Sequence, residues 1–267
     1  MQNNRPIGVF DSGIGGLTVA RGIVEALPHE RLIYFGDTAH LPYGDKSADA
    51  IRYYCLRIGK FLVEKNCKAI VIACNSASTA GYRTLLDFFA DRAVFVNVVD
   101  PLVRAVAAQP FRKVGVIATK ATVRSNVYAQ QLQLLRPDLE VVSIATPLLA
   151  PMIEEGFVHN AVSSAVLREY LGDPRLGGID ALLLACTHYP LIREAVAEQL
   201  PEGVRIYDSI AVVADDLHAK LAARDLLATA PQGGHHFYVS DYTASFEAAT
   251  RVFYPDTVQL EHVPVWG

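Results

Sequence analysis

Short apolar runs alternate with longer segments of helical period along the whole chain. Segments 47–64 and 211–227 are examples of the predicted helices. Strands that alternate with helices at this spacing predict an α/β fold with mostly parallel sheets and right-handed crossovers. Runs such as AIVIA and ALLLA are apolar at every position, which is typical of strands covered on both faces. The nine predicted strands are 6–10, 32–35, 69–73, 94–98, 113–118, 140–144, 181–185, 204–207 and 236–239.

Two parts of the chain resemble each other. KVGVIAT (113–119) is similar to PIGVFDS (6–12), and ALLLACTHYPL around Cys186 is similar to AIVIACNSAST around Cys74. The offsets are 107 and 112 residues and the order is the same, which favours two related α/β halves. The alternative is that buried strand–turn–helix units simply look alike.

The repeat sets the expected domains. We expect a first α/β domain at 1–99 plus 208–267, which holds Cys74, and a second at 100–207, which holds Cys186. Asp100-Pro101 is the expected crossing point, because proline disfavours the continuation of a helix or strand. An active site would then lie in the cleft between the two domains.

Composition narrows the classes of function. The 267 residues are 51% hydrophobic and 19% charged, with a net charge of −4 and no basic block, so nucleic acid is not an expected partner. No apolar stretch approaches the roughly 18–20 residues of a membrane span. MQNNRPIGVF lacks the pattern of a signal peptide, so we expect a cytoplasmic protein.

The chain has four cysteines, at positions 55, 67, 74 and 186. A disulfide framework is not expected in a reducing compartment. Their spacing matches no metal-binding motif, so no metal is expected. Cys55 and Cys67 fit the role of small buried apolar residues. Cys74 and Cys186 differ, because each follows an apolar run and is expected at the carboxyl end of a strand, where open α/β sheets bind ligands.

The neighbours of these two cysteines carry polar groups. Asn75, Ser76 and Thr187 are suited to capping a following helix and to holding a carboxylate or ammonium group. A helix that starts after each cysteine is expected to lower the pKa of the thiol. His188 is placed to assist proton transfer at Cys186.

Two further loops follow predicted strands. DSGIGG (11–16) is not a dinucleotide loop, since position 18 is threonine, and no GK[ST] follows. It predicts either a helix N-terminus that binds an anion or a tight turn capped by Asp11. GDTAHLPYG (36–44) is a polar loop of the kind that carries function, although its residues are also ordinary turn residues.

A pair of equivalent thiols suits inversion at an amino acid α-carbon. The α-proton leaves one face and another proton returns to the opposite face, so one group acts as base and the other as acid. The developing carbanion needs donors around the carboxylate. A redox or binding protein with a reversible Cys74–Cys186 disulfide is the alternative from another class; it needs α-carbons within about 7 Å.

At this point the motifs resemble a known family. GVFDSGIGGLTV, GDTAHLPYG, ACNSAST and ACTHYPL, together with TPLLAPMIEEG, resemble glutamate racemase over residues 8–208. CTHYPL favours this family over the related aspartate and hydantoin racemases. A racemase for another acidic or cyclic substrate is the close alternative.

The resemblance implies two facing α/β domains with glutamate buried between them, no cofactor, a possible homodimer, and a supply of D-glutamate for bacterial peptidoglycan. It implies that Cys74 acts on D-glutamate and Cys186 on L-glutamate, with Asp11 and His188 as auxiliary acid/base groups and Glu154 as a further catalytic residue. The substrate contacts that it implies are Asp11, Ser12, Tyr43, Gly44, Asn75, Ser76, Thr187 and His188. Many members have threonine at Ser76; the hydroxyl is kept, so that contact is expected to persist.

Overall fold

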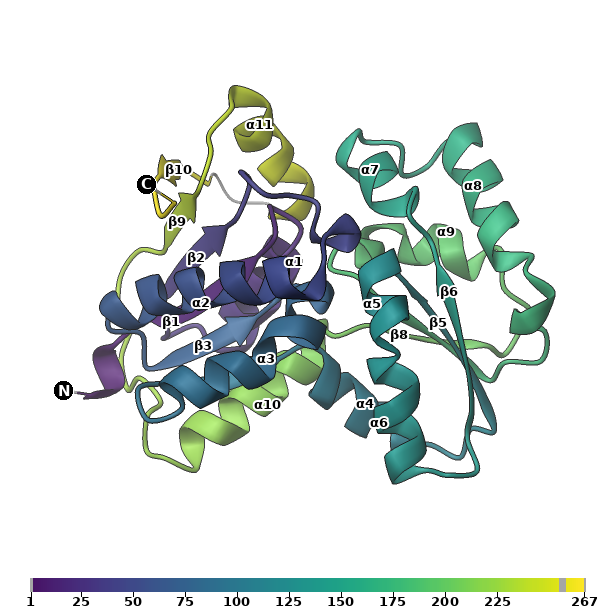
Figure 1. Cartoon of the computed structure of the whole chain (residues 1–267), viewed down its shortest axis with the longest axis horizontal. Coiled ribbons are helices and arrows are strands. Elements are labelled where there is room, and N and C mark those ends of the chain that lie inside the picture. Colours follow the sequence, from purple (N-terminus) through teal and green to yellow (C-terminus); the bar gives the residue numbers. More distant parts are fainter. Residues whose placement is uncertain (1, 255–257, 267) are drawn as a thin grey trace.

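The computed structural model describes residues 2–254 and 258–266, which form two lobes around two separate sheets (Figure 1). The strands are β1 (Ile7–Asp11), β2 (Leu32–Gly36), β3 (Ala69–Ile72), β4 (Val94–Asn97), β5 (Lys113–Ala118), β6 (Glu140–Ala145), β7 (Ala181–Ala185), β8 (Arg205–Tyr207), β9 (His236–Val239) and β10 (Leu260–His262). The α-helices are α1 (Leu17–Ala26), α2 (Ala48–Glu64), α3 (Asn75–Phe89), α4 (Val99–Ala107), α5 (Lys120–Ser125), α6 (Val127–Leu135), α7 (Leu149–Glu154), α8 (Ala161–Leu171), α9 (Arg193–Ala197), α10 (Ile210–Ala222) and α11 (Ala244–Phe253). Short 3₁₀ helices are η1 (Gln2–Asn4), η2 (Tyr43–Asp45), η3 (Pro174–Leu176) and η4 (Tyr189–Ile192).

Both sheets are parallel. The sheet of the first lobe has the order β10-β9-β2-β1-β3-β4, and the sheet of the second lobe has the order β6-β5-β7-β8. Each pairing between neighbouring strands is parallel. The predicted α/β class is therefore confirmed, and each of the nine predicted strands is present with ends within one residue of the prediction. The edge strand β10 was not predicted.

The two sheets share one strand order. β2-β1-β3-β4 in the first lobe corresponds to β6-β5-β7-β8 in the second, with β1 and β5 as the equivalent inner strands. β3 leads to Cys74 and β7 leads to Cys186, so the two thiols occupy equivalent places in the two halves. This agreement is what two related halves predict.

Helices cover the strands on both faces, which explains the continuous apolar runs. α2 packs beside α3, as Figure 1 shows, and α1 packs beside α10. The chain crosses to the second lobe through α4 and returns through α10, whose contacts include β4. β1, β2 and β7 are buried at every position.

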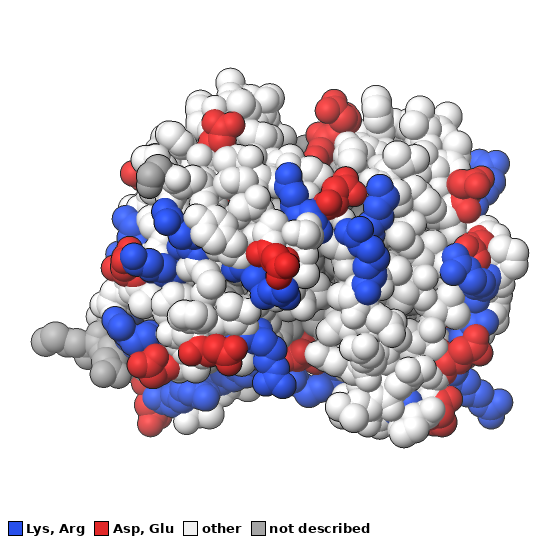
Figure 2. All heavy atoms as spheres, in the orientation of Figure 1, with Lys and Arg blue, Asp and Glu red and all other residues white. Residues whose placement is uncertain are grey.

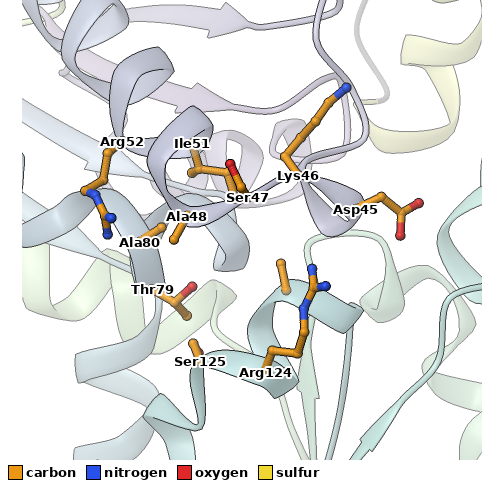
Figure 3. Close-up of a pocket in the computed structure, with 11 residues that line it drawn as sticks. Asp45, Lys46, Ser47, Ala48, Ile51, Arg52, Thr79, Ala80, Arg124 and Ser125 are labelled. Carbon is orange, nitrogen blue, oxygen red and sulfur yellow. The ribbon is translucent and has the colours of Figure 1, made fainter.

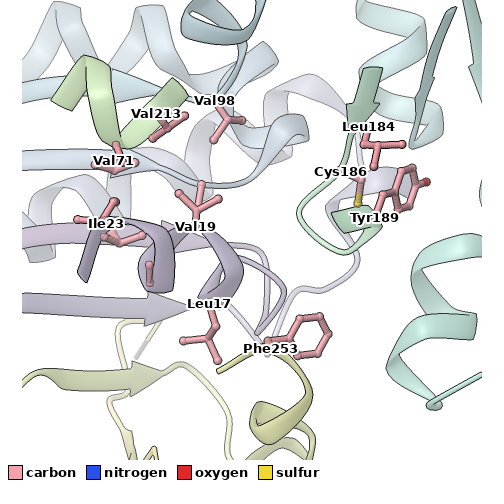
Figure 4. Close-up of a cluster of buried hydrophobic side chains, with 14 of the residues drawn as sticks. Leu17, Val19, Ile23, Val71, Val98, Leu184, Cys186, Tyr189, Val213 and Phe253 are labelled. Atoms are coloured by element: carbon pink, nitrogen blue, oxygen red, sulfur yellow. The ribbon is translucent and has the colours of Figure 1, made fainter. Parts of the chain in front are cut away.

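One apolar cluster continues from the first lobe into the second. It includes Leu17 and Val19 of α1, Cys186 and Tyr189 after β7, and Phe253 of α11. Figure 4 shows Cys186 beside Tyr189, and Phe253 near Leu17 at the N-terminal end of α1. The surroundings of Cys186 are therefore built from both lobes.

The predicted helix 211–227 is too long, because α10 ends at Ala222. Asp225 has a left-handed φ of 53°, and the Leu226 N–H donates to the Leu221 carbonyl at 3.0 Å. This pattern is that of a Schellman ending. Glycine is the usual sequence signal for such an ending, and here aspartate stands in its place.

Within the described residues, no helix is long and apolar enough to cross a membrane. Figure 2 shows basic and acidic side chains mixed over the visible face of both lobes.

Candidate active site

A cavity of about 190 Å³ lies between the lobes at the carboxyl ends of β1, β3, β5 and β7. Both Cys74 and Cys186 line it. Ten of the predicted site residues meet here, namely Ser12, Tyr43, Gly44, Cys74, Asn75, Ser76, Glu154, Cys186, Thr187 and His188. Asp11 is the predicted residue that is not part of the lining.

A second, wider pocket of about 450 Å³ lies beside it, between the start of α2, α3 and α5 (Figure 3). Its lining includes Lys46, Arg52 and Arg124, and Figure 3 shows Arg124 pointing toward the loop that carries Asp45 and Lys46. Neither Cys74 nor Cys186 lines this pocket. The groups suited to proton transfer are therefore gathered in the smaller cavity.

Cys74 caps helix α3. Its Sγ accepts the Ala77 N–H at 3.4 Å, and its S–H donates to the Ser12 hydroxyl at 3.7 Å. Burial and the nearby Asp11 carboxylate raise the pKa of Cys74 well above its ordinary value, although the two hydrogen bonds oppose the shift. The start of α3 was expected to lower the pKa of Cys74. This expectation is wrong, because removal of the thiol from water outweighs the effect of the helix N-terminus. Once formed, a Cys74 thiolate is a strong base.

Asp11 lies behind the cavity and is 1% exposed. Its Oδ2 accepts the backbone N–H of Gly16 at 2.9 Å and that of Gly13 at 3.3 Å. The glycine-rich loop is thus a turn closed by Asp11. The N–H groups of Gly13 and Gly16 donate to the Asp11 carboxylate and are not free to bind another anion. Burial raises the pKa of Asp11, with His188 and the backbone N–H groups opposing the shift. Its Oδ1 is buried without a hydrogen-bond partner among the described residues, so it can take or give a proton.

Cys186 belongs to a chain of three polar groups. Its Sγ lies 3.7 Å from Nδ1 of His188, and Nε2 of His188 lies 2.8 Å from Oε1 of Glu154. Burial by itself disfavours the charged ring, but the hydrogen bonds to Cys186 and Glu154 outweigh it and raise the pKa of His188 to about 10. His188 therefore carries its proton at neutral pH, next to the second thiol.

After β7 we expected a helix capped by Thr187, and the structure differs. The chain enters the 3₁₀ helix η4 through His188, and no side chain caps that helix. Thr187 lies in the cavity wall with its Oγ1 3.3 Å from Nδ1 of His188. Asn75 and Ser76 likewise lie inside α3 and leave the capping position to Cys74.

Asn75 and Ser76 reach across to the second lobe. The hydroxyl of Tyr128 donates to Oδ1 of Asn75 at 2.6 Å, and Oγ of Ser76 lies 2.9 Å from Oγ1 of Thr119. These contacts tie the first turn of α3 to α5 and α6.

Two glycines permit the close approach of the lobes. A Cβ at Gly15 would lie 2.3 Å from Cε1 of His188, and a Cβ at Gly44 would lie 2.9 Å from Cβ of Thr119. Both distances are shorter than a nonbonded carbon contact allows. Glycine at these positions is therefore required by the packing of the lobes.

A hydrogen bond to a buried carboxylate fixes the side chain of Tyr43. Its hydroxyl donates to Oδ2 of the buried Asp37 at 2.6 Å, and Oδ1 of Asp37 accepts from Ser240 at 2.6 Å. Tyr43 lines the cavity while its hydroxyl is engaged with Asp37. Asp37 links this loop to the segment after β9.

Sequence reasoning missed several residues of the site. Thr119 lines the cavity and corresponds to Ser12 in the repeat, so the alignment of the two halves was a signal for it. Tyr128 lies on α6, outside any of the motifs, and nothing in its sequence context marks it. The other unpredicted lining residues are Gly13, Leu41, Pro42, Ala150 and Pro151.

Glu154→Gln is expected to lower the pKa of His188 below about 10, because it removes a carboxylate partner of the imidazolium. A raised folded-state pKa stabilises the fold fully below the unfolded value, about pH 6.5, and this stabilisation is lost as pH rises through the folded value. The melting temperature of Glu154→Gln should therefore lie furthest below wild type near pH 6 and approach it near pH 10. Histidine ¹⁵N NMR titration measures the pKa directly.

Glu155→Gln is the matched control, because the exposed Glu155 is the neighbouring residue on the chain and makes no contact with His188. It should leave the His188 titration unchanged. An unchanged titration in Glu154→Gln as well would show that Glu154 does not hold the His188 proton.

Comparison with known proteins agrees with this geometry. Residues 7–217 match the family model Asp/Glu/Hydantoin racemase. A glutamate racemase of Geobacter metallireducens is 43% identical over 244 residues, covering 91% of this chain and 90% of the relative. One from Streptococcus equi subsp. equi is 36% identical over 263 residues, covering 98% and 99%.

Solved structures are similar over nearly the whole chain. The glutamate racemase of Francisella tularensis in complex with D-glutamate has a TM-score of 0.93 and 39% identity, covering 99% of each chain. That of Thermus thermophilus in complex with beta-chloro-D-alanine has a TM-score of 0.89 and 37% identity, covering 98% and 97%. The resemblance to glutamate racemases seen in the motifs is confirmed, and the chain belongs to the Asp/Glu/Hydantoin racemase family of isomerases.

Proposed function

We propose that this racemase interconverts L- and D-glutamate by proton transfer between Cys74 and Cys186, without a cofactor. One observation carries the proposal: two free, buried thiols at equivalent places in the two halves line a single cavity of about 190 Å³. A cavity of this size suits an amino acid.

The reaction needs one thiolate and one thiol. With L-glutamate, the Cys186 thiolate takes the α-proton, and the electron pair left on Cα delocalises into the carboxylate. The Cys74 thiol then donates its proton to the opposite face of Cα and becomes a thiolate. With D-glutamate the two thiols exchange roles, so one proton leaves and one returns in either direction.

The two thiols have different partners that set these proton states. The protonated His188 lies 3.7 Å from Cys186 and stabilises negative charge on that sulfur. Cys74 is held protonated by burial and by Asp11. The reaction from L- to D-glutamate uses a thiolate at Cys186 and a thiol at Cys74, and the reverse reaction uses the opposite pair. Asp11 and His188 exchange protons with the sulfurs between turnovers, and Glu154 supports His188.

The remaining lining residues bind the substrate. The Asn75 amide and the hydroxyls of Ser12, Ser76 and Thr187 can donate to carboxylate oxygens or accept from the ammonium group. Negative charge grows on the α-carboxylate as the proton leaves, so donors fixed around it stabilise the transition state more than the ground state. Cys74, Asn75, Ser76 and Thr187 are each at most 5% exposed, and burial strengthens the interactions of such groups with a bound charge. Asp11 lies outside the lining and acts on the substrate through the glycine-rich loop that it closes. Tyr43 and Gly44 form part of the cavity wall.

We propose domains at 1–99 plus 208–267 and at 100–207, which the membership of the two sheets supports. We also propose that the enzyme is cytoplasmic, forms a homodimer and supplies D-glutamate for peptidoglycan.

The substrate and the cellular role have direct tests. The purified protein should racemise both enantiomers of glutamate, with aspartate turned over at least about 100-fold more slowly in kcat/KM because one methylene changes the reach between the carboxylates. It should also let a bacterial strain without its own glutamate racemase grow in the absence of added D-glutamate. Faster turnover of aspartate would identify a racemase for another acidic substrate.

A further inference from the structure

The hydroxyl of Tyr128 makes a buried contact between the lobes. Tyr128 is 2% exposed on α6 of the second lobe, and its hydroxyl donates to Oδ1 of Asn75, on α3 of the first lobe, at 2.6 Å. Burial raises the pKa of Tyr128, so the hydroxyl keeps its proton and remains a donor. Tyr128 itself does not line the cavity.

This contact leaves the other end of the amide free. Nδ2 of Asn75 is buried and has no hydrogen-bond partner among the described residues, although Asn75 lines the cavity and is only 3% exposed. A buried N–H without an acceptor is costly. Because Oδ1 is held by Tyr128, the amide cannot turn without breaking that bond. An acceptor that enters the cavity, such as a carboxylate oxygen, satisfies the free N–H.

We propose that Tyr128 is a positioning residue for substrate binding: its hydroxyl orients the Asn75 amide so that Nδ2 donates to a carboxylate of the substrate. The inference rests on the proposed function, since it takes an amino acid carboxylate as the ligand. It also makes the binding group depend on the approach of the lobes, because the tyrosine and the asparagine come from opposite sides of the cleft.

Tyr128→Phe removes one oxygen atom and keeps the ring. KM is expected to rise about 5- to 10-fold for both enantiomers, with kcat changed less than about threefold, since a loosened amide weakens a contact made to the bound substrate. The two values of kcat/KM must fall by the same factor, because the equilibrium constant between enantiomers is one. The dissociation constant of D-glutamate from calorimetry should rise with KM.

The control is Tyr189→Phe. Tyr189 is also fully buried in the second lobe, and its hydroxyl bonds to Thr146, not to Asn75. It should lower the melting temperature as Tyr128→Phe does and leave KM within twofold of wild type. A similar rise in KM for both variants would assign a general packing role to Tyr128 and overturn the proposal.

A double-mutant cycle separates positioning from packing. In an Asn75→Ala background, Tyr128→Phe should raise KM by less than twofold further, because the group through which it acts is gone. The full rise in both backgrounds would overturn the proposal.

Asn75→Asp gives an independent measure should Tyr128→Phe fold poorly. It keeps an acceptor for Tyr128 but removes the free N–H, so it should weaken D-glutamate binding at least as much as Asn75→Ala. Wild-type affinity in Asn75→Asp would contradict the assigned donor. A wild-type protein that neither binds nor turns over glutamate would instead overturn the proposed function, and this inference with it.

Discussion

Replacing either Cys74 or Cys186 by alanine is expected to lower kcat for glutamate at least about 10³-fold in both directions. One well-placed acid or base contributes roughly 10²- to 10⁴-fold. Here every turnover requires both thiols, one to remove the proton and one to return it. Loss of either therefore blocks the forward and the reverse reaction alike. Circular dichroism at a wavelength that separates the enantiomers measures both rates.

Cys67→Ala is the control for the loss of a buried thiol. Cys67 is 1% exposed, and burial raises its pKa to about 12, yet it does not line the cavity. Its replacement should leave kcat within about twofold of wild type. Racemisation above a few per cent in Cys74→Ala or Cys186→Ala would contradict the two-thiol account.

Asp11→Asn and His188→Asn are each expected to lower kcat/KM by about 10²-fold, the lower range for an acid/base group that acts through another. Asparagine at position 11 keeps an oxygen for the Gly16 N–H but cannot exchange a proton with Cys74. Asparagine at position 188 removes the charge beside Cys186. Each substitution therefore removes a group that exchanges protons with one of the two sulfurs.

The equilibrium constant gives these two variants an internal check. It equals one for a pair of enantiomers, so kcat/KM must fall by the same factor for L- and D-glutamate in each variant. The individual values of kcat and KM are free to differ between directions. A loss smaller than about threefold in Asp11→Asn would reduce Asp11 to the turn-closing role that its bonds to Gly13 and Gly16 already provide.

The strands were readable from the sequence because parallel strands covered on both faces are apolar at every position. β10 was not, since it is three residues long, lies at the edge of the sheet, and has a polar sequence, Leu-Glu-His. The early end of α10 depends on the conformation of Asp225, which carries none of the usual signals for a helix end.

The site was largely predictable for a related reason. Strand ends in a parallel sheet meet at one edge, so the motifs after β1, β3 and β7 had to lie close together. The contact of Tyr128 with Asn75 and the raised pKa of Cys74 could not be predicted from the sequence. The contact depends on how the second lobe packs against α3, and the pKa depends on burial and on the nearby Asp11. Burial of a strand-end thiol is a tertiary property, and it reversed the direction expected from the helix alone.

Hydrogen exchange during the first turnover tests the two-thiol mechanism most directly. L-Glutamate with hydrogen at Cα is incubated with the enzyme in D₂O, and the product is analysed by mass spectrometry before the reverse reaction contributes. The account predicts D-glutamate that carries deuterium at Cα, while unreacted L-glutamate retains hydrogen, because the proton taken by Cys186 is not the one that Cys74 delivers. Product that retains the substrate hydrogen would show a single group moving the proton across Cα and would contradict the account.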